Sequence, residues 1–211
     1  MPRTILITGF GPFPGAPFNP TETLVRRLAR ERQPAVADVT IVPHIFRTSY
    51  AAVDCDLPSL LREYRPDAIL MFGLAARTPH LRIETSAQNA VAGFADVDRH
   101  APNRRVVNRD RPGRLALPTP ARRLLASAHA TRVPAALSRD AGRYLCNYLC
   151  WRAAEAVRTA NGPRVAAFIH VPLVRRGPLP AARVKKRGVT MADLLRAGRG
   201  FLRVVVSAAR R

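Results

Sequence analysis

The stretch TILITG at residues 4–9 is a short run of apolar and β-branched residues that ends in a glycine. Such a run is typical of a buried parallel strand that leads into a loop. After the loop at residues 9–18, NPTE at residues 19–22 supplies an N-cap, a proline at the first helical position and a glutamate at the third. We therefore expect a helix from there to about Arg32, and with it the start of an α/β fold.

The same alternation of strands and helices continues along the chain. Further strands are expected at residues 38–45, 66–73, 82–90 and 165–169, and further helices at 49–64, 119–130, 141–159 and from Thr190 onward. The last of these helices should begin with a capping box formed by Thr190 and Asp193. Residues 91–118 and 173–189 are predicted to be irregular. This order predicts one α/β domain over residues 1–211, with a mostly parallel twisted sheet and helices on both of its faces.

Three features fall at the predicted carboxyl ends of strands, where α/β sheets carry their chemistry. They are the Gly9-Phe10 pair, Gly73 and His170. Because the carboxyl ends of parallel strands meet at one edge of a sheet, we expect these residues to share a crevice.

The formal net charge is +21, and it is distributed unevenly. Residues 1–98 carry ten basic and ten acidic side chains, whereas residues 99–211 carry 25 basic and 4 acidic ones. Two interpretations fit this pattern: a solvated, arginine-rich surface, or a face that holds an anionic partner such as RNA. We favour the first, because no nucleic-acid motif with interleaved aromatic residues accompanies the charge, so nucleic acid is not expected as a partner.

The chain shows neither a secretory signal at its start nor an apolar run of the length that a bilayer requires. Its three cysteines are an odd number, which favours reduced thiols over a disulfide framework. We therefore expect a soluble, cytoplasmic protein that does not bind a membrane.

Cys146, His170 and Glu84 are the candidate catalytic residues. Cys146 falls near the start of the helix expected from residue 141, where the helix N-terminus stabilises a thiolate. His170 ends an apolar strand, and Glu84 sits in a strand-like segment from which a carboxylate can orient an imidazole. Each has a structural alternative: Cys146 and Cys150 could share a core face, His170 could be a hydrogen-bonded structural residue, and Glu84 could be an exposed strand residue. A metal site is not expected, because the usual ligand pairs are absent.

Several ordered segments carry a resemblance to a known family. They are TGFGPF at 8–13 followed by NP at 19–20, PDAI at 66–69 with Gly73, Glu84 with Asn89, SRDAGRYLCNY at 138–148, and FIHVP at 168–172. Together they resemble pyroglutamyl peptidase I, also called pyrrolidone-carboxylate peptidase, over most of the chain. The resemblance implies a three-layer α/β/α sandwich and a cysteine peptidase that removes N-terminal pyroglutamyl residues.

The resemblance also assigns roles to residues. It implies a Cys146 nucleophile, a His170 base and Glu84 orienting the histidine, without a metal or organic cofactor. Phe10 and Phe13 would form an apolar slot for the pyrrolidone ring, and Asn19 would help to fix the substrate, although its role as a helix N-cap is an equal alternative. The substrates would be N-terminally pyroglutamylated peptides, and family members commonly form dimers or tetramers.

Two positions depart from the family pattern. Leu74 stands where the family places a glutamine that contacts the ring amide, and Phe94 stands where it places an arginine near the active site. A lost hydrogen-bonding partner changes specificity strongly. The alternative function is therefore a weakened or altered-specificity paralogue that uses its basic half to bind an anionic partner.

Overall fold

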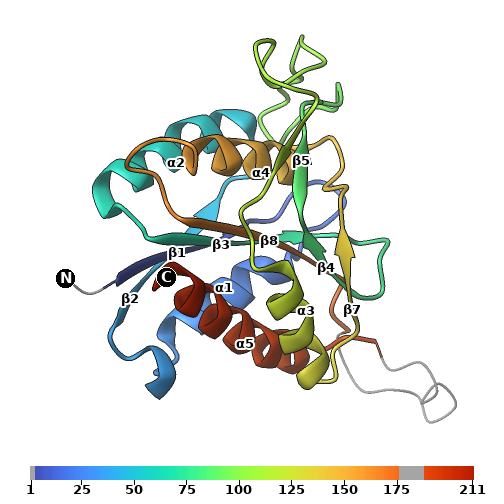
Figure 1. Ribbon diagram of the computed structural model, residues 1–211. Helices are drawn as coiled ribbons and strands as arrows, with labels where there is room; N and C mark the ends of the chain where they lie inside the picture. Colours follow the sequence, from blue (N-terminus) through green and yellow to red (C-terminus); the bar gives the residue numbers. More distant parts are fainter. Residues whose placement is uncertain (1–2, 176–187) are drawn as a thin grey trace, which may run out of the picture.

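A twisted six-stranded sheet forms the middle layer of the computed structural model, which describes residues 3–175 and 188–211 (Figure 1). Its strands are β1 (Arg3–Phe10), β2 (Val39–Phe46), β3 (Ala68–Leu74), β4 (Leu81–Glu84), β7 (Ala135–Ser138) and β8 (Val165–Val171). Their order is β2-β1-β3-β8-β4-β7. Neighbouring strands run parallel except β4 and β8, which are antiparallel. The predicted mostly parallel α/β fold is confirmed.

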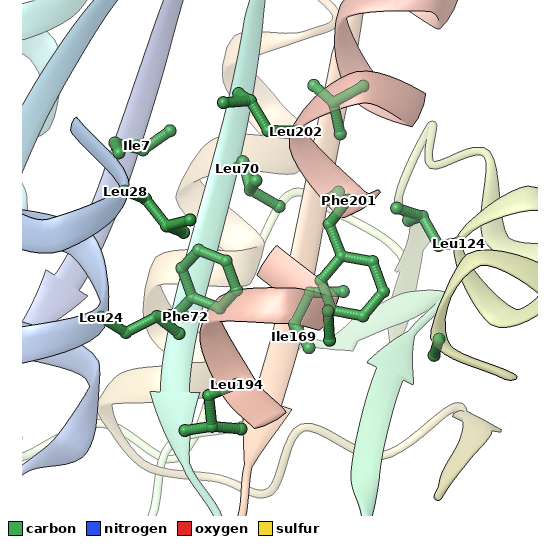
Figure 2. Packing of buried hydrophobic residues seen from close by; sticks show 14 of the residues in the cluster. Ile7, Leu24, Leu28, Leu70, Phe72, Leu124, Ile169, Leu194, Phe201 and Leu202 are labelled. Carbon is green, nitrogen blue, oxygen red and sulfur yellow. The ribbon is translucent and has the colours of Figure 1, made fainter. Parts of the chain in front are cut away.

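Helices cover both faces of this sheet (Figure 1). One face carries α1 (Pro20–Arg30), α3 (Ala121–Ala130) and α5 (Met191–Ala209), and the other carries α2 (Tyr50–Tyr64) and α4 (Leu145–Ala156). Successive strand residues point to opposite faces, so Leu70 and Phe72 belong to the first core while Ile69 and Met71 belong to the second. Figure 2 shows Phe72 meeting the leucines of α1, with Phe201 of α5 beside Ile169.

The helix starts predicted at Asn19 and Thr190 are both present. The side chain of Asn19 accepts a hydrogen bond from the backbone N–H of Thr21 and caps α1. At α5, Thr190 and Asp193 form the expected capping box, in which each side chain bonds the other residue's backbone N–H. The sequence was sufficient to predict the starts of α1 and α5, because a helix cap is formed by residues that are neighbours along the chain.

The single strand predicted at residues 82–90 is wrong, because the chain leaves the main sheet after Glu84. Residues beyond Thr85 form β5 (Ser86–Gln88), which pairs with β6 (Arg114–Ala116) in a separate two-stranded sheet. The region 91–118, predicted to be irregular, therefore contains a strand. The short edge strand β7 was not predicted either.

The helix expected from residue 141 begins later than predicted, at Leu145. Gly142 explains the delay, since its φ of 82° lies in the left-handed region that a helix cannot continue through. The later start moves Cys146 to the second residue of α4.

Two buried polar side chains hold the segment between β5 and β6. The Asn89 side-chain oxygen accepts from the backbone N–H groups of Val107 and Asn108, both at 2.9 Å. Asp96 accepts from the backbone N–H of Tyr50, the first residue of α2, at 3.0 Å. The segment is thus tied to the body of the fold by satisfied hydrogen bonds.

The loop expected at residues 173–189 lies largely outside the described residues. Within the described ranges, no helix combines the length and the apolar character that a bilayer crossing requires.

Candidate active site

Cys146 lies in the first turn of α4, at the edge of the sheet reached by the ends of β3 and β8. The N-cap residue Tyr144 makes no side-chain hydrogen bond to this turn, so the turn's N–H groups are not capped by their own N-cap. Peptide dipoles give a helix N-terminus a positive partial charge, which stabilises a thiolate and an oxyanion. The position of Cys146 therefore suits a nucleophile.

Asn147 fixes this turn in place. Its side-chain oxygen accepts from the backbone N–H of Gln88 at 2.8 Å, and its amide nitrogen donates to the carbonyls of Gln88 and Ala90 at 2.8 and 3.0 Å. Asn147 is fully buried. The helix that carries Cys146 is thereby bound to the strand that follows Glu84.

Gly73 provides the space into which the Cys146 sulfur fits. A Cβ at position 73 would lie 2.7 Å from Cys146 Sγ and 2.6 Å from the ring of Phe168. Gly73 is also the partner of His170 in the β3–β8 register. The sulfur therefore packs directly over the strand pair that carries the histidine.

The Gly73→Ala variant is expected to lower kcat about 10- to 100-fold, because the new methyl group displaces the sulfur and a shift on the order of 1 Å can cost that much. Steady-state hydrolysis and thermal unfolding of the variant would measure the effect. Gly113→Ala is the control, since a Cβ there meets no atom within 4 Å. An unchanged kcat in a stably folded Gly73→Ala variant would contradict this account of the site.

His170 and Glu84 meet across the antiparallel pair of β4 and β8. His170 Nδ1 and Glu84 Oε1 lie 2.8 Å apart, and both side chains are buried. The bond to the carboxylate leaves the opposite ring nitrogen available. These contacts exclude the alternative in which Glu84 is an exposed strand residue.

The charges around His170 favour its protonated form. Burial alone would lower the pKa of His170, but attraction to a Cys146 thiolate and the bond to Glu84 outweigh burial and raise the pKa to about 9. The arrangement therefore favours an imidazolium at His170, held by Glu84 and facing Cys146.

The substrate residues expected from the sequence occupy two places. Phe10 is buried at the end of β1, with its ring 5.9 Å from that of Phe46, and Phe13 is half-buried in the following loop. Asn19 is buried and donates to the carbonyl of Gly11 at 3.1 Å in addition to capping α1. Asn19 therefore shapes the loop that carries both phenylalanines.

The two positions that depart from the family differ in exposure. Leu74 is half-buried at the end of β3 and pairs with Val171, one residue beyond the pair of Gly73 and His170. The side chain of Phe94 is 69% exposed. Nearby, the backbone N–H of Ala92 donates to the Arg143 carbonyl, so the segment of Phe94 runs beside the start of α4.

Two functional positions were not predicted as such from the sequence. Gly73 was noted as a strand end, yet nothing in the residues around it indicated contact with Cys146. Asn147 follows the cysteine within the quoted motif, but the sequence did not show that its side chain is buried. Both contacts join segments that are far apart along the chain.

Comparison with known proteins agrees with this geometry. A family model of pyroglutamyl peptidase matches residues 3–193. The pyrrolidone-carboxylate peptidase of Halalkalibacterium halodurans is 32% identical over 198 residues, covering 93% of this chain and 96% of that protein. The same-named protein of Cupriavidus pinatubonensis is 32% identical over 183 residues, covering 86% of this chain and 82% of that protein.

A solved structure shares the fold. The pyrrolidone carboxyl peptidase from Thermococcus litoralis matches with a TM-score of 0.86 at 24% identity, covering 99% of this chain and 95% of that chain. The family match and the two relatives indicate the same enzyme class, so this chain is a hydrolase of the cysteine-type omega-peptidase class. It belongs to the pyroglutamyl peptidase family.

Proposed function

We propose that this protein removes an N-terminal pyroglutamyl residue from peptides, with Cys146 as nucleophile, His170 as acid and base, and Glu84 orienting the histidine. The observation that carries the proposal is the position of His170, which bonds Glu84 at 2.8 Å and is charge-coupled to Cys146. This contact supports a site to which α4, β8 and β4 each contribute one residue, as thiol acyl transfer requires.

The reaction begins with attack of the Cys146 thiolate on the pyroglutamyl carbonyl carbon. A C–S bond forms, and backbone N–H groups at the start of α4 stabilise the oxyanion. The His170 imidazolium then gives its proton to the leaving amine, the C–N bond breaks, and the shortened peptide departs. Water, deprotonated by His170, hydrolyses the thioester and releases pyroglutamate and the thiolate.

Substrate recognition is proposed to involve Phe10, Phe13, Asn19 and Leu74. The pyrrolidone ring is flat and carries no charged amine, which suits an apolar slot between aromatic side chains. Leu74 adds apolar surface one residue past Gly73, where the sulfur lies. The names of the two relatives, both pyrrolidone-carboxylate peptidases, support this acyl group.

The alternative, a paralogue that binds an anionic partner, receives less support. Some arginines of the basic half are engaged within the fold: Arg199 bonds Glu31 at 2.7 Å, and Arg210 bonds Asp38 at 2.7 Å. The relatives that cover this chain are peptidases. We therefore favour the hydrolase.

The proposed setting is the cytoplasm, where thiols stay reduced, and all three cysteines are free. A dimer or tetramer is proposed from the family alone. No step of the mechanism depends on either proposal.

A panel of aminoacyl amides of one fluorogenic amine, which includes several N-blocked residues and the unblocked prolyl amide, tests the acyl specificity. We expect turnover of the pyroglutamyl amide and a kcat/KM at least about 100-fold lower for the prolyl amide, whose charged amine would be desolvated against Phe10 and Phe13. Preference for a different blocked residue would overturn the pyroglutamyl assignment. Absence of turnover on every amide, together with salt-sensitive retention on RNA, would favour the alternative.

A further inference from the structure

The environment of Glu84 is incomplete without a neighbouring cation. Its carboxylate is fully buried, and Oε1 contacts both His170 Nδ1 at 2.8 Å and Arg82 Nη2 at 3.2 Å. Among the described residues, Oε2 has no hydrogen-bond partner. A buried carboxylate is costly unless a charge and hydrogen bonds compensate it. The single engaged oxygen of Glu84 is thus shared between the histidine and one arginine.

Arg82 is well placed to hold this carboxylate. It lies two residues before Glu84, on the same face of β4, and it is the register partner of His170 on β8. Its guanidinium is about one-quarter exposed. A planar guanidinium with several donors is suited to contact more than one acceptor in a fixed geometry.

The same guanidinium also contacts the loop that leads to the nucleophile. Arg82 Nη2 donates to Ser138 Oγ at 2.7 Å and to the backbone carbonyl of Asp140. This loop continues through Gly142 into α4, where Cys146 is the second helical residue. One side chain therefore bridges the carboxylate end and the thiol end of the site.

We propose that Arg82 is a positioning residue that fixes the Glu84 carboxylate against His170 and ties it to the loop before Cys146. The inference rests on the proposed Cys146–His170–Glu84 mechanism and adds a fourth charged group to it. With Arg82, the buried Glu84 carboxylate has a second cationic partner beside His170. Without it, the carboxylate has one bond and freedom to turn, and the imidazole loses its fixed orientation.

Arg114, the first residue of β6, offers a matched control because it contacts the same loop. Its Nη1 donates to Ser86 Oγ at 2.8 Å and to the backbone carbonyl of Arg139. Within the part of the chain that the structure describes, its hydrogen bonds involve no atom of Glu84. A loss of activity caused only by loosening of the 138–140 loop should therefore appear in the variants of both arginines. A loss of activity that acts through Glu84 should appear only in the Arg82 variant.

Steady-state kinetics of Arg82→Gln, Arg114→Gln, Glu84→Gln and the double variant Arg82→Gln/Glu84→Gln test the inference. We expect Arg82→Gln to lower kcat on the order of 10- to 100-fold with KM changed less than about threefold, because orientation rather than binding is lost. Arg114→Gln should stay within about threefold of the wild type. The double variant should be no slower than Glu84→Gln, since Arg82 acts through that carboxylate.

Thermal unfolding of each variant separates folding from catalysis. If Arg82→Gln does not fold, Arg82→Lys carries the test; its kcat should fall well below that of the wild type, because the lysine ammonium lies one bond closer to the backbone than Nη2, the nitrogen that makes all three contacts, and falls short of them. A folded Arg82 variant with wild-type kcat, equal losses in the two arginine variants, or additive losses in the double variant would overturn the inference. Full activity in Glu84→Gln would instead overturn the proposed triad.

Discussion

Replacing Cys146 by serine is expected to lower kcat/KM on the pyroglutamyl amide by on the order of 10⁵-fold or more. A hydroxyl in this position stays protonated near neutral pH, so the helix start and His170 have no stable anion to support. The fold should be kept, because serine differs from cysteine only in having the smaller oxygen in place of sulfur. The side chain at this position is also only partly buried. Release of the fluorogenic amine by wild type and variant measures the ratio.

The other two thiols supply the controls for this prediction. Cys55 is exposed on α2, so Cys55→Ser should keep wild-type activity and wild-type sensitivity to iodoacetamide. Burial raises the pKa of the Cys150 thiol well above its usual value, and that group should resist alkylation. A Cys146→Ser variant that retains more than about 1% of the activity would refute thiolate attack at this residue.

Replacing His170 by glutamine is expected to lower kcat/KM by on the order of 10⁴-fold or more, since neither the leaving amine nor the attacking water then has a proton partner. Glutamine keeps an amide N–H that can reach Glu84, so the buried carboxylate is not left without a donor. Near-normal thermal unfolding of the variant would separate the catalytic effect from a loss of fold.

The pH profile gives an independent check on His170. Its pKa is raised above the ordinary value to about 9, so the imidazolium persists through neutral pH and is lost as the pH rises through 9. The wild-type kcat/KM should therefore fall on the alkaline side near pH 9. A fall centred near the ordinary histidine value of about 6.5 would show that Cys146 and Glu84 do not hold the proton there.

Local signals in the sequence predicted much of the fold. The caps at Asn19 and Thr190 depend on residues within one turn, and they were predicted correctly. The division of residues 82–90 was not predictable in this way, because β5 is formed by pairing with β6, a partner some 28 residues away in sequence. Short edge strands such as β7 depend on the same kind of distant pairing.

The candidate site likewise has one part that the sequence predicted and one part that depends on distant pairing. Motif spacing brought Cys146, His170 and Glu84 forward as a group, and the geometry around them was invisible in the sequence. Contact between Gly73 and the sulfur, and between Arg82 and the carboxylate, requires β3, β8 and β4 to be already side by side. Gly73 was part of the quoted resemblance and Arg82 was not, but neither contact follows from the sequence, so only the assembled sheet identifies them.

The antiparallel pairing of β4 and β8 has a consequence for the folding of the enzyme. The bond between His170 and Glu84 joins residues 86 positions apart, and it closes a strand pair with opposite chain directions. Closing so long a loop is slow and comes after local structure has formed. A growing or half-folded chain therefore lacks the orienting bond even when its thiol is present.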